Sequence, residues 1–131
     1  MKSSGTLVDT SVWIDFFRGA PSIKLALEKL IARDEIFTAG PILYELLQGV
    51  RLPEERKQVK EALLSTNYLE ITSNDWEVAA LLSSTLRAQG LTLPMTDILI
   101  GHLAKVRNLE VISFDPRFDQ IPGIKHRKLT P

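Results

Sequence analysis

The chain contains no cysteine among its 131 residues. This absence excludes disulfide bonds, thiolate metal sites and cysteine nucleophiles, so any bound metal must rest on oxygen or imidazole ligands. Long hydrophobic runs are also missing. No stretch approaches the ~20 apolar residues that cross a bilayer, and residues 1–6 carry no apolar signal segment. We therefore expect a cytoplasmic protein that does not enter a membrane.

An excess of either charge is absent as well. Sixteen lysines and arginines balance sixteen aspartates and glutamates, which argues against a surface that coats nucleic acid non-specifically. The balance leaves room for an enzyme that reaches phosphate through metal ions and a few basic side chains. A chain of this length with 44% hydrophobic residues has the size of one domain, so we expect residues 1–131 to form a single domain.

The order of the predicted elements indicates an α/β fold. Strands are predicted at residues 6–8, 35–38, 68–71 and 109–114, with a short last strand at 124–129. Helices are predicted at residues 12–18, 22–33, 40–50, 53–65, 76–89 and 97–107. Asn74 or Asp75 is the expected cap of the fifth helix, and Thr96 with Asp97 that of the sixth. The alternation predicts a three-layer α/β/α sandwich around a mostly parallel sheet.

Four acidic residues stand where a parallel sheet presents its ligand site. Asp9 and Asp115 each follow a predicted strand, Glu45 lies one turn into the third helix, and Asp97 begins the last one. Ligands of open α/β sheets bind in the crevice beyond the carboxyl ends of the strands. Four carboxylates gathered there would repel one another unless a cation compensates their charge. Oxygen ligands of this kind suit Mg²⁺ or Mn²⁺.

Each of these residues also has a purely structural interpretation. Asp9 and Asp97 could cap helices, and Asp115 before Pro116 could start a turn. Glu45 could belong to a solvated helical stripe. The functional interpretation therefore rests on the joint placement of the four residues and not on any one of them.

The residues around Asp97 and the two histidines carry further expectations. Gly101 lies one turn beyond Asp97 on the same helical face and leaves room for another element to approach. His102 points to a different side of the helix, which favours an imidazole in the core or facing a partner over a metal ligand. His126 lies in the basic run at residues 125–128, where a solvated edge is favoured over a phosphate contact.

The first predicted helix is apolar nearly all round. Trp13, Ile14, Phe16 and Phe17 occupy positions that cannot all face one sheet. Burial under the second helix accounts for part of this pattern, and the surplus indicates a surface for a protein partner.

Four segments, taken in order, resemble the signatures of one known family. They read LVDTSVWIDFFRG at residues 7–19, GPILYELLQGV at 40–50, LRAQGLTLPMTDILIGHLAKVRNLEVIS at 86–113 and FDPRF at 114–118. Together they are similar to PIN-domain ribonucleases of the VapC toxin type, and the similarity spans nearly the whole chain. The resemblance implies Mg²⁺-dependent endonucleolytic cleavage of RNA, with Mn²⁺ as a substitute. It also implies a cognate antitoxin and assembly as a homodimer or a toxin–antitoxin hetero-oligomer.

The resemblance also assigns roles to particular residues. Asp9, Glu45, Asp97 and Asp115 match the family's acidic positions. By this interpretation Asp9 and Asp97 are the principal ligands of one or two Mg²⁺ ions that activate a water, and the other two complete the shell. Ser11 matches a hydroxyl position that supports the site.

Two residues depart from the family pattern. Ser113 stands where threonine is more usual, a change that keeps the hydroxyl. Arg117 replaces an acidic residue often found two positions after the fourth aspartate, which removes an auxiliary metal contact and offers a basic group near substrate phosphate.

Other protein classes also place aspartates at strand ends. A haloacid-dehalogenase-like phosphatase needs a second aspartate two residues after its nucleophile, but position 11 is serine. A receiver domain needs an acidic pair near the first strand and a lysine after the last, and neither is evident. A non-catalytic PIN-like binding module would lose carboxylates, whereas all four are present.

Overall fold

Five parallel strands form one sheet in the part of the chain that the structure describes. The structure is a computed structural model that describes residues 5–129. The strands are β1 (Thr6–Val8), β2 (Ile36–Ala39), β3 (Asn67–Leu69), β4 (Glu110–Ile112) and β5 (Lys125–Arg127). Their spatial order is β3-β2-β1-β4-β5, and each neighbouring pair is parallel. The prediction of a parallel α/β sheet is confirmed.

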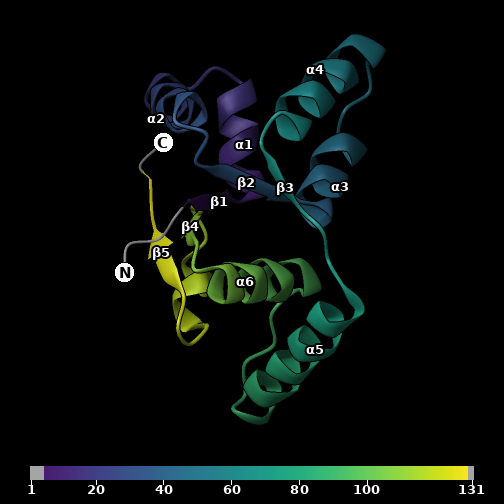
Figure 1. The fold of residues 1–131 in the computed structure, drawn as a ribbon, viewed down its shortest axis with the longest axis vertical. Helices are drawn as coiled ribbons and strands as arrows, with labels where there is room; N and C mark the ends of the chain where they lie inside the picture. Colours follow the sequence, from purple (N-terminus) through teal and green to yellow (C-terminus); the bar gives the residue numbers. More distant parts are fainter. Residues whose placement is uncertain (1–4, 130–131) are drawn as a thin grey trace.

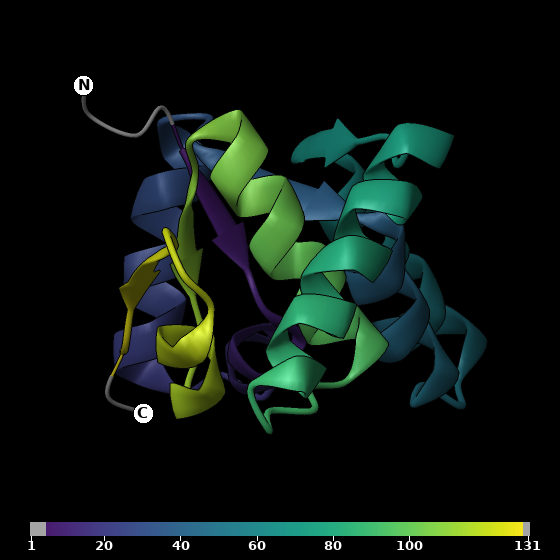
Figure 2. The same ribbon diagram turned by 90° about the horizontal axis from the view of Figure 1, so that it is seen from below.

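Helices cover both faces of this sheet (Figure 1). One layer holds α1 (Thr10–Phe17), α2 (Pro21–Ala32), α3 (Gly40–Gln48) and α4 (Pro53–Leu64), and the other holds α5 (Ser73–Ala88) and α6 (Met95–Arg107). Figure 2 shows α6 lying across β1 with α5 beside it. Within residues 5–129, no helix has the length and apolar character needed to span a membrane.

The path of the chain reverses its direction across the sheet between β1 and β4. From β1 the chain winds outward through β2 to β3, and α5 and α6 then return it to β4 on the other side of β1. Ligands of open parallel sheets bind at such a reversal, beyond the carboxyl ends of the strands. Val8 pairs with Ile112, so β1 and β4 end side by side at this point.

Helix α6 forms the centre of its layer. All residues from 97 to 104 are buried. A Cβ atom on Gly101 would lie 2.8 Å from the Cδ1 atom of Ile121 and 3.2 Å from that of Ile124. The space predicted at Gly101 is therefore filled by the segment that leads to β5, and any larger residue would push this segment away.

Both predicted caps of the last two helices are wrong. Thr72, not Asn74 or Asp75, is the N-cap of α5: its Oγ1 accepts a bond from the Asp75 N–H at 3.1 Å, and Asp75 Oδ2 accepts one from the Thr72 N–H at 2.9 Å. This reciprocal capping box fixes the start of the helix. Pro94 is the N-cap of α6, because its fixed φ suits a helix entry. Asp97 thus lies inside the first turn and is not a cap.

The apolar residues of α1 divide between the core and the surface. Trp13 is fully buried, whereas Ile14 is 38% and Phe17 37% exposed. The Phe16 and Phe17 rings lie 5.4 and 5.7 Å from the Trp13 ring. Of these apolar side chains, the exposed Ile14 and Phe17 are the ones available to a partner protein.

A five-residue 3₁₀ helix, η1 (Pro116–Gln120), follows β4 and was not predicted. Asp115 stands directly before it, and its side chain accepts a hydrogen bond from the Arg117 N–H at 2.9 Å. The turn-forming interpretation of Asp115 is therefore confirmed.

Candidate active site

The reversal of the sheet gathers the predicted acidic residues. Asp9 follows β1 and Asp115 lies three residues beyond β4. Asp97 is the third residue of α6, which contacts both of these strands. Glu45 comes from α3, which packs against α1. One edge of the sheet thus collects carboxylates from four separate parts of the chain.

Asp9 is buried and held by two serine hydroxyls. Its Oδ2 accepts a bond from Ser113 Oγ at 2.8 Å and one from Ser11 Oγ at 3.2 Å. Ser113 Oγ also accepts a bond from the Asp115 N–H at 3.0 Å. Asp9 has the N-cap position of α1 but makes no side-chain capping bond. Both predicted supporting serines therefore hold a carboxylate, which is not used to cap the helix.

Glu45 is held by a residue that the sequence interpretation missed. Thr10 Oγ1 donates a hydrogen bond to Glu45 Oε1 at 2.7 Å. Thr10 directly follows Asp9, so a hydroxyl beside a strand-end aspartate was the available signal. The contact depends on the packing of α1 against α3, and local sequence does not reveal that packing.

Asp97 carries the strongest electrostatic signature of the site. It is 9% exposed, and its Oδ2 has no hydrogen-bond partner among the described residues. The pKa of Asp97 is raised to about 6, first because the side chain is buried and next because of the negative charge of Asp9. Asp115 and Glu45 raise this pKa further, while Arg117 lowers it. Asp97 therefore senses the other three carboxylates, and the positive charge of Arg117 offsets only part of their effect.

Arg117 binds Asp115 through a forked contact. Its Nε lies 3.1 Å from Oδ1 and 2.9 Å from Oδ2 of Asp115, and its Nη2 lies 2.6 Å from Oδ2. These hydrogen bonds hold the pKa of Asp115 below its usual range. Nη2 also approaches Asp97 Oδ2 to 3.5 Å, so the guanidinium lies between two carboxylates.

The two histidines serve the fold around the site. His102 is buried in the core as expected, and its Nε2 pairs with Asp75 Oδ1 at 2.9 Å. The predicted solvated edge at His126 is wrong, because its side chain is only 2% exposed. His126 Nδ1 lies 2.8 Å from Asp119 Oδ1, and Nε2 lies 3.1 Å from the carbonyl oxygen of Ser113. His126 thus contacts the backbone of Ser113, whose side chain donates a hydrogen bond to Asp9.

The donor set fits a hard divalent cation. The site offers carboxylate and hydroxyl oxygens, and the unpartnered Asp97 Oδ2 is a buried anionic atom that a cation would satisfy. Within residues 5–129, however, no three acidic or histidine side chains already stand close enough together to hold a metal ion.

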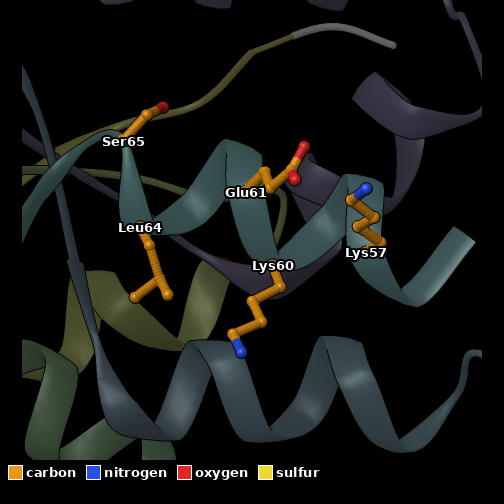
Figure 3. A pocket seen from close by; sticks show the side chains of 5 residues that line it. All are labelled: Lys57, Lys60, Glu61, Leu64 and Ser65. Carbon is orange, nitrogen blue, oxygen red and sulfur yellow. The ribbon is translucent and has the colours of Figure 1, made fainter. Parts of the chain in front are cut away.

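Two surface hollows differ in their relation to these carboxylates. Figure 3 shows the one on α4. It is lined by Lys57, Lys60, Glu61, Leu64 and Ser65, all from one helix and its end. A groove of about 570 Å³ between α1, α3 and α4 instead includes Glu45, together with the exposed Ile14 and Phe17. Only this groove adjoins the candidate site.

An all-parallel three-layer domain with acidic residues at the reversal of its sheet belongs to the α/β proteins that bind ligands at this edge. The chain belongs to the PIN domain family, whose model, described as "PIN domain", matches residues 6–124. The family resemblance seen in the sequence is confirmed. No curated protein matches the chain in sequence.

Solved structures of similar fold cover nearly the whole chain. VapBC2 from Rickettsia felis, bound to a DNA fragment from its promoter, gives a TM-score of 0.82 at 20% identity over 95% of this chain and 98% of that one. DNA-bound VapBC from Salmonella typhimurium gives 0.80 at 21% identity, over 98% of both chains. Mycobacterium tuberculosis VapC20, described as a Sarcin-Ricin loop cleaving toxin, gives 0.70 at 14% identity, over 97% of this chain and 100% of that one.

Proposed function

We propose that this protein is a Mg²⁺-dependent endoribonuclease and the toxin component of a type II toxin–antitoxin system. The observation that carries the proposal is the buried Asp97 carboxylate, which has an unpartnered oxygen and a raised pKa among three further carboxylates. Groups with shifted pKa values in a ligand crevice mark functional sites. Membership of the PIN domain family supports a nuclease activity.

In this proposal the four carboxylates hold the metal. Asp9 and Asp97 are the principal ligands, and Glu45 and Asp115 complete the shell directly or through water. When bound, Mg²⁺ or its substitute Mn²⁺ supplies Lewis-acid chemistry that lowers the pKa of a bound water and stabilises charge on a phosphodiester. The chain itself must present its carboxylates in ionised form at one edge of the sheet.

The hydroxyl groups orient these ligands. Ser113 and Ser11 both donate to Oδ2 of Asp9, which restrains the rotation of its carboxylate. Thr10 restrains Glu45 in the same way. Partners of this kind keep ligands in place, and their loss lowers metal affinity or activity by about 10- to 100-fold. Arg117 is the basic group placed to meet substrate phosphate.

The toxin assignment and its partners draw on the structural relatives. The proteins from Rickettsia felis and Salmonella typhimurium are described as VapBC, and VapC20 as a Sarcin-Ricin loop cleaving toxin. We therefore propose RNA as the substrate, a cognate antitoxin as the partner and the cytoplasm as the location. Assembly would be a homodimer or a toxin–antitoxin hetero-oligomer.

The groove beside Glu45 is the surface proposed for the antitoxin. Ile14 and Phe17 leave apolar area exposed there. Phe17→Ser should weaken binding of the peptide encoded by an adjacent short reading frame by at least about tenfold, with little change in melting temperature. Trp13→Ser is the contrasting variant: its side chain is fully buried, so it should lose about 3–5 kcal/mol of stability. Equal binding by the folded Phe17→Ser variant would remove this surface from the interface.

The function is tested by RNA cleavage and by growth. Purified protein should cleave RNA with Mg²⁺ and not with EDTA. Induction without a partner should arrest a bacterial host, and Asp9→Asn should relieve the arrest while the protein stays soluble. Asparagine keeps the shape and removes the charge, so the comparison isolates metal binding. Equal toxicity of Asp9→Asn, or cleavage that EDTA leaves unchanged, would contradict the proposal.

A further inference from the structure

A positively charged side chain of the protein, Arg117, lies among the carboxylates of the candidate site. Arg117 is the second residue of η1, and its guanidinium contacts both carboxylate oxygens of Asp115. The same group reaches 3.5 Å from the unpartnered oxygen of Asp97, and it opposes the repulsion that the other carboxylates exert there. One positive charge is thus shared between two of the four proposed metal ligands.

This contact and a metal ion exclude each other at Asp115. Arg117 Nε lies within 3.1 Å of both Oδ1 and Oδ2, and Nη2 lies within 2.6 Å of Oδ2. A forked contact of this kind covers the edge of the carboxylate that a cation would approach. The guanidinium lies between Asp115 and Asp97, at 2.6 Å and 3.5 Å from their Oδ2 atoms.

Arg117 is free to leave this position. Its side chain is 49% exposed, so it can rotate into solvent without disturbing the core. The backbone bond from its N–H to Asp115 Oδ1 at 2.9 Å does not depend on the guanidinium. Release of the side chain would therefore uncover Asp115 while η1 keeps its shape.

We propose that Arg117 is an internal counter-cation that competes with the divalent metal for Asp115 and Asp97. It neutralises the carboxylates before metal arrives and sets the metal concentration at which the site fills. This inference rests on the proposed function, since it concerns the same carboxylate site. An arginine that only grips RNA phosphate would leave metal affinity in the absence of RNA unchanged.

A matched pair of variants isolates this competition. Arg117→Gln removes the competing charge. Arg127→Gln removes the same charge from a side chain of similar exposure, 51%, on the edge strand β5, where its Nε pairs with Glu110 Oε1 of β4 at 2.7 Å. Arg117→Lys keeps the charge and loses the fork. The full chain, stripped with EDTA and dialysed, is titrated with Mn²⁺, and binding is followed by calorimetry and by the electron paramagnetic resonance signal of free Mn²⁺.

Arg117→Gln should bind Mn²⁺ more tightly than wild type, on the order of twofold to fivefold, as expected for release of one exposed ion pair. Arg117→Lys should fall between them, and Arg127→Gln should match the wild type. Equal or weaker binding by Arg117→Gln overturns the inference, as does equal tightening by Arg127→Gln. If the competition fails in this way but the wild type binds Mn²⁺ and Asp97→Asn does not, the proposed metal site still stands. Absence of Mn²⁺ binding in every variant overturns the metal site together with the competition.

Discussion

Two aspartates occupy equivalent places in consecutive helices and differ in their electrostatics. Asp75 is the third residue of α5 and Asp97 the third of α6. Their exposed fractions are 7% and 9%. The pKa of Asp75 is lowered, first by the hydrogen bond from the backbone of Thr72 and then by that from His102. The pKa of Asp97 is raised to about 6.

Burial raises the pKa of both aspartates, but hydrogen bonds outweigh it at Asp75, whereas at Asp97 burial comes first and neighbouring carboxylates add to it. Both oxygens of Asp75 accept hydrogen bonds, from the N–H and hydroxyl of Thr72 at Oδ2 and from His102 at Oδ1. One oxygen of Asp97 accepts no hydrogen bond, and its charged neighbours are three carboxylates and the guanidinium of Arg117 at 3.5 Å. A buried carboxylate whose two oxygens both accept hydrogen bonds stabilises the fold. A buried carboxylate with an oxygen that accepts none is available to a ligand.

The largest expected difference between the two aspartates is in catalysis. Asp97→Asn should lower the rate of RNA cleavage by about 10²- to 10³-fold, because it removes a metal ligand that contributes several kcal/mol to the transition state. Asp75→Asn should cleave at the wild-type rate per folded molecule. Initial rates with Mg²⁺, normalised to the folded fraction from circular dichroism, measure both. A fully active Asp97→Asn protein would make the two aspartates equivalent.

For the free energy of unfolding the order is reversed, and substitution of Asp75 should have the larger effect. Asp75→Ala should lower the free energy of unfolding by about 2–4 kcal/mol, since it removes the capping box and leaves the buried His102 without its partner. Asp97→Ala in EDTA should stay within about 1 kcal/mol of wild type, because relief of repulsion offsets the lost charge in the first turn. Urea unfolding provides the numbers. Equal losses in the two variants would assign Asp97 to the framework.

Added Mg²⁺ should stabilise variants of the two aspartates to different extents. At ten times its dissociation constant, Mg²⁺ should stabilise the wild type by about 1.4 kcal/mol, since it binds the native state alone. Asp75→Ala should keep this increment and Asp97→Ala should lose it. Melting curves with EDTA and with Mg²⁺ at matched ionic strength suffice. An equal increment in all three proteins would remove Asp97 from the metal site.

The smallest expected effect is on the pH dependence of the metal-free protein. Because the pKa of Asp97 rises to about 6 on folding, its contribution is complete below about pH 4 and is lost as the pH rises through 6. Asp75 has the opposite sign: its contribution is present above about pH 4 and is lost as the pH falls. Asp97→Asn should therefore flatten the decline in the free energy of unfolding between pH 4 and 6, by an amount on the order of 1 kcal/mol. An unchanged slope in urea titrations would contradict the raised pKa.

The sequence predicts those features of the site that depend on local order. Asp9 and Asp115 could be placed because a strand of alternating or apolar residues ends just before each of them. Gly101 could be interpreted because glycine inside a buried helix requires a close neighbour, and Ile121 is that neighbour. Such inferences need only the position of a residue within its own element.

Contacts between elements could not be predicted in this way. Arg117 carries no sign that it folds back onto Asp115, because the unpredicted η1 makes that contact. The burial of His126 was missed because lysine and arginine surround it in sequence. Strand alternation was the overlooked signal: Lys125 and Arg127 are exposed on β5, and His126 between them faces inward.

The bond between Ser113 and Asp9 joins positions 104 residues apart, and this separation bears on how the protein is made. A chain emerging from a ribosome presents β1 long before β4, its neighbour in the finished sheet. Contacts of such long range form late, because loop closure must precede them. Until residues 110–115 emerge, Asp9 lacks its partner Ser113. The proposed metal site is therefore completed only after both ends of this 104-residue separation have been synthesised.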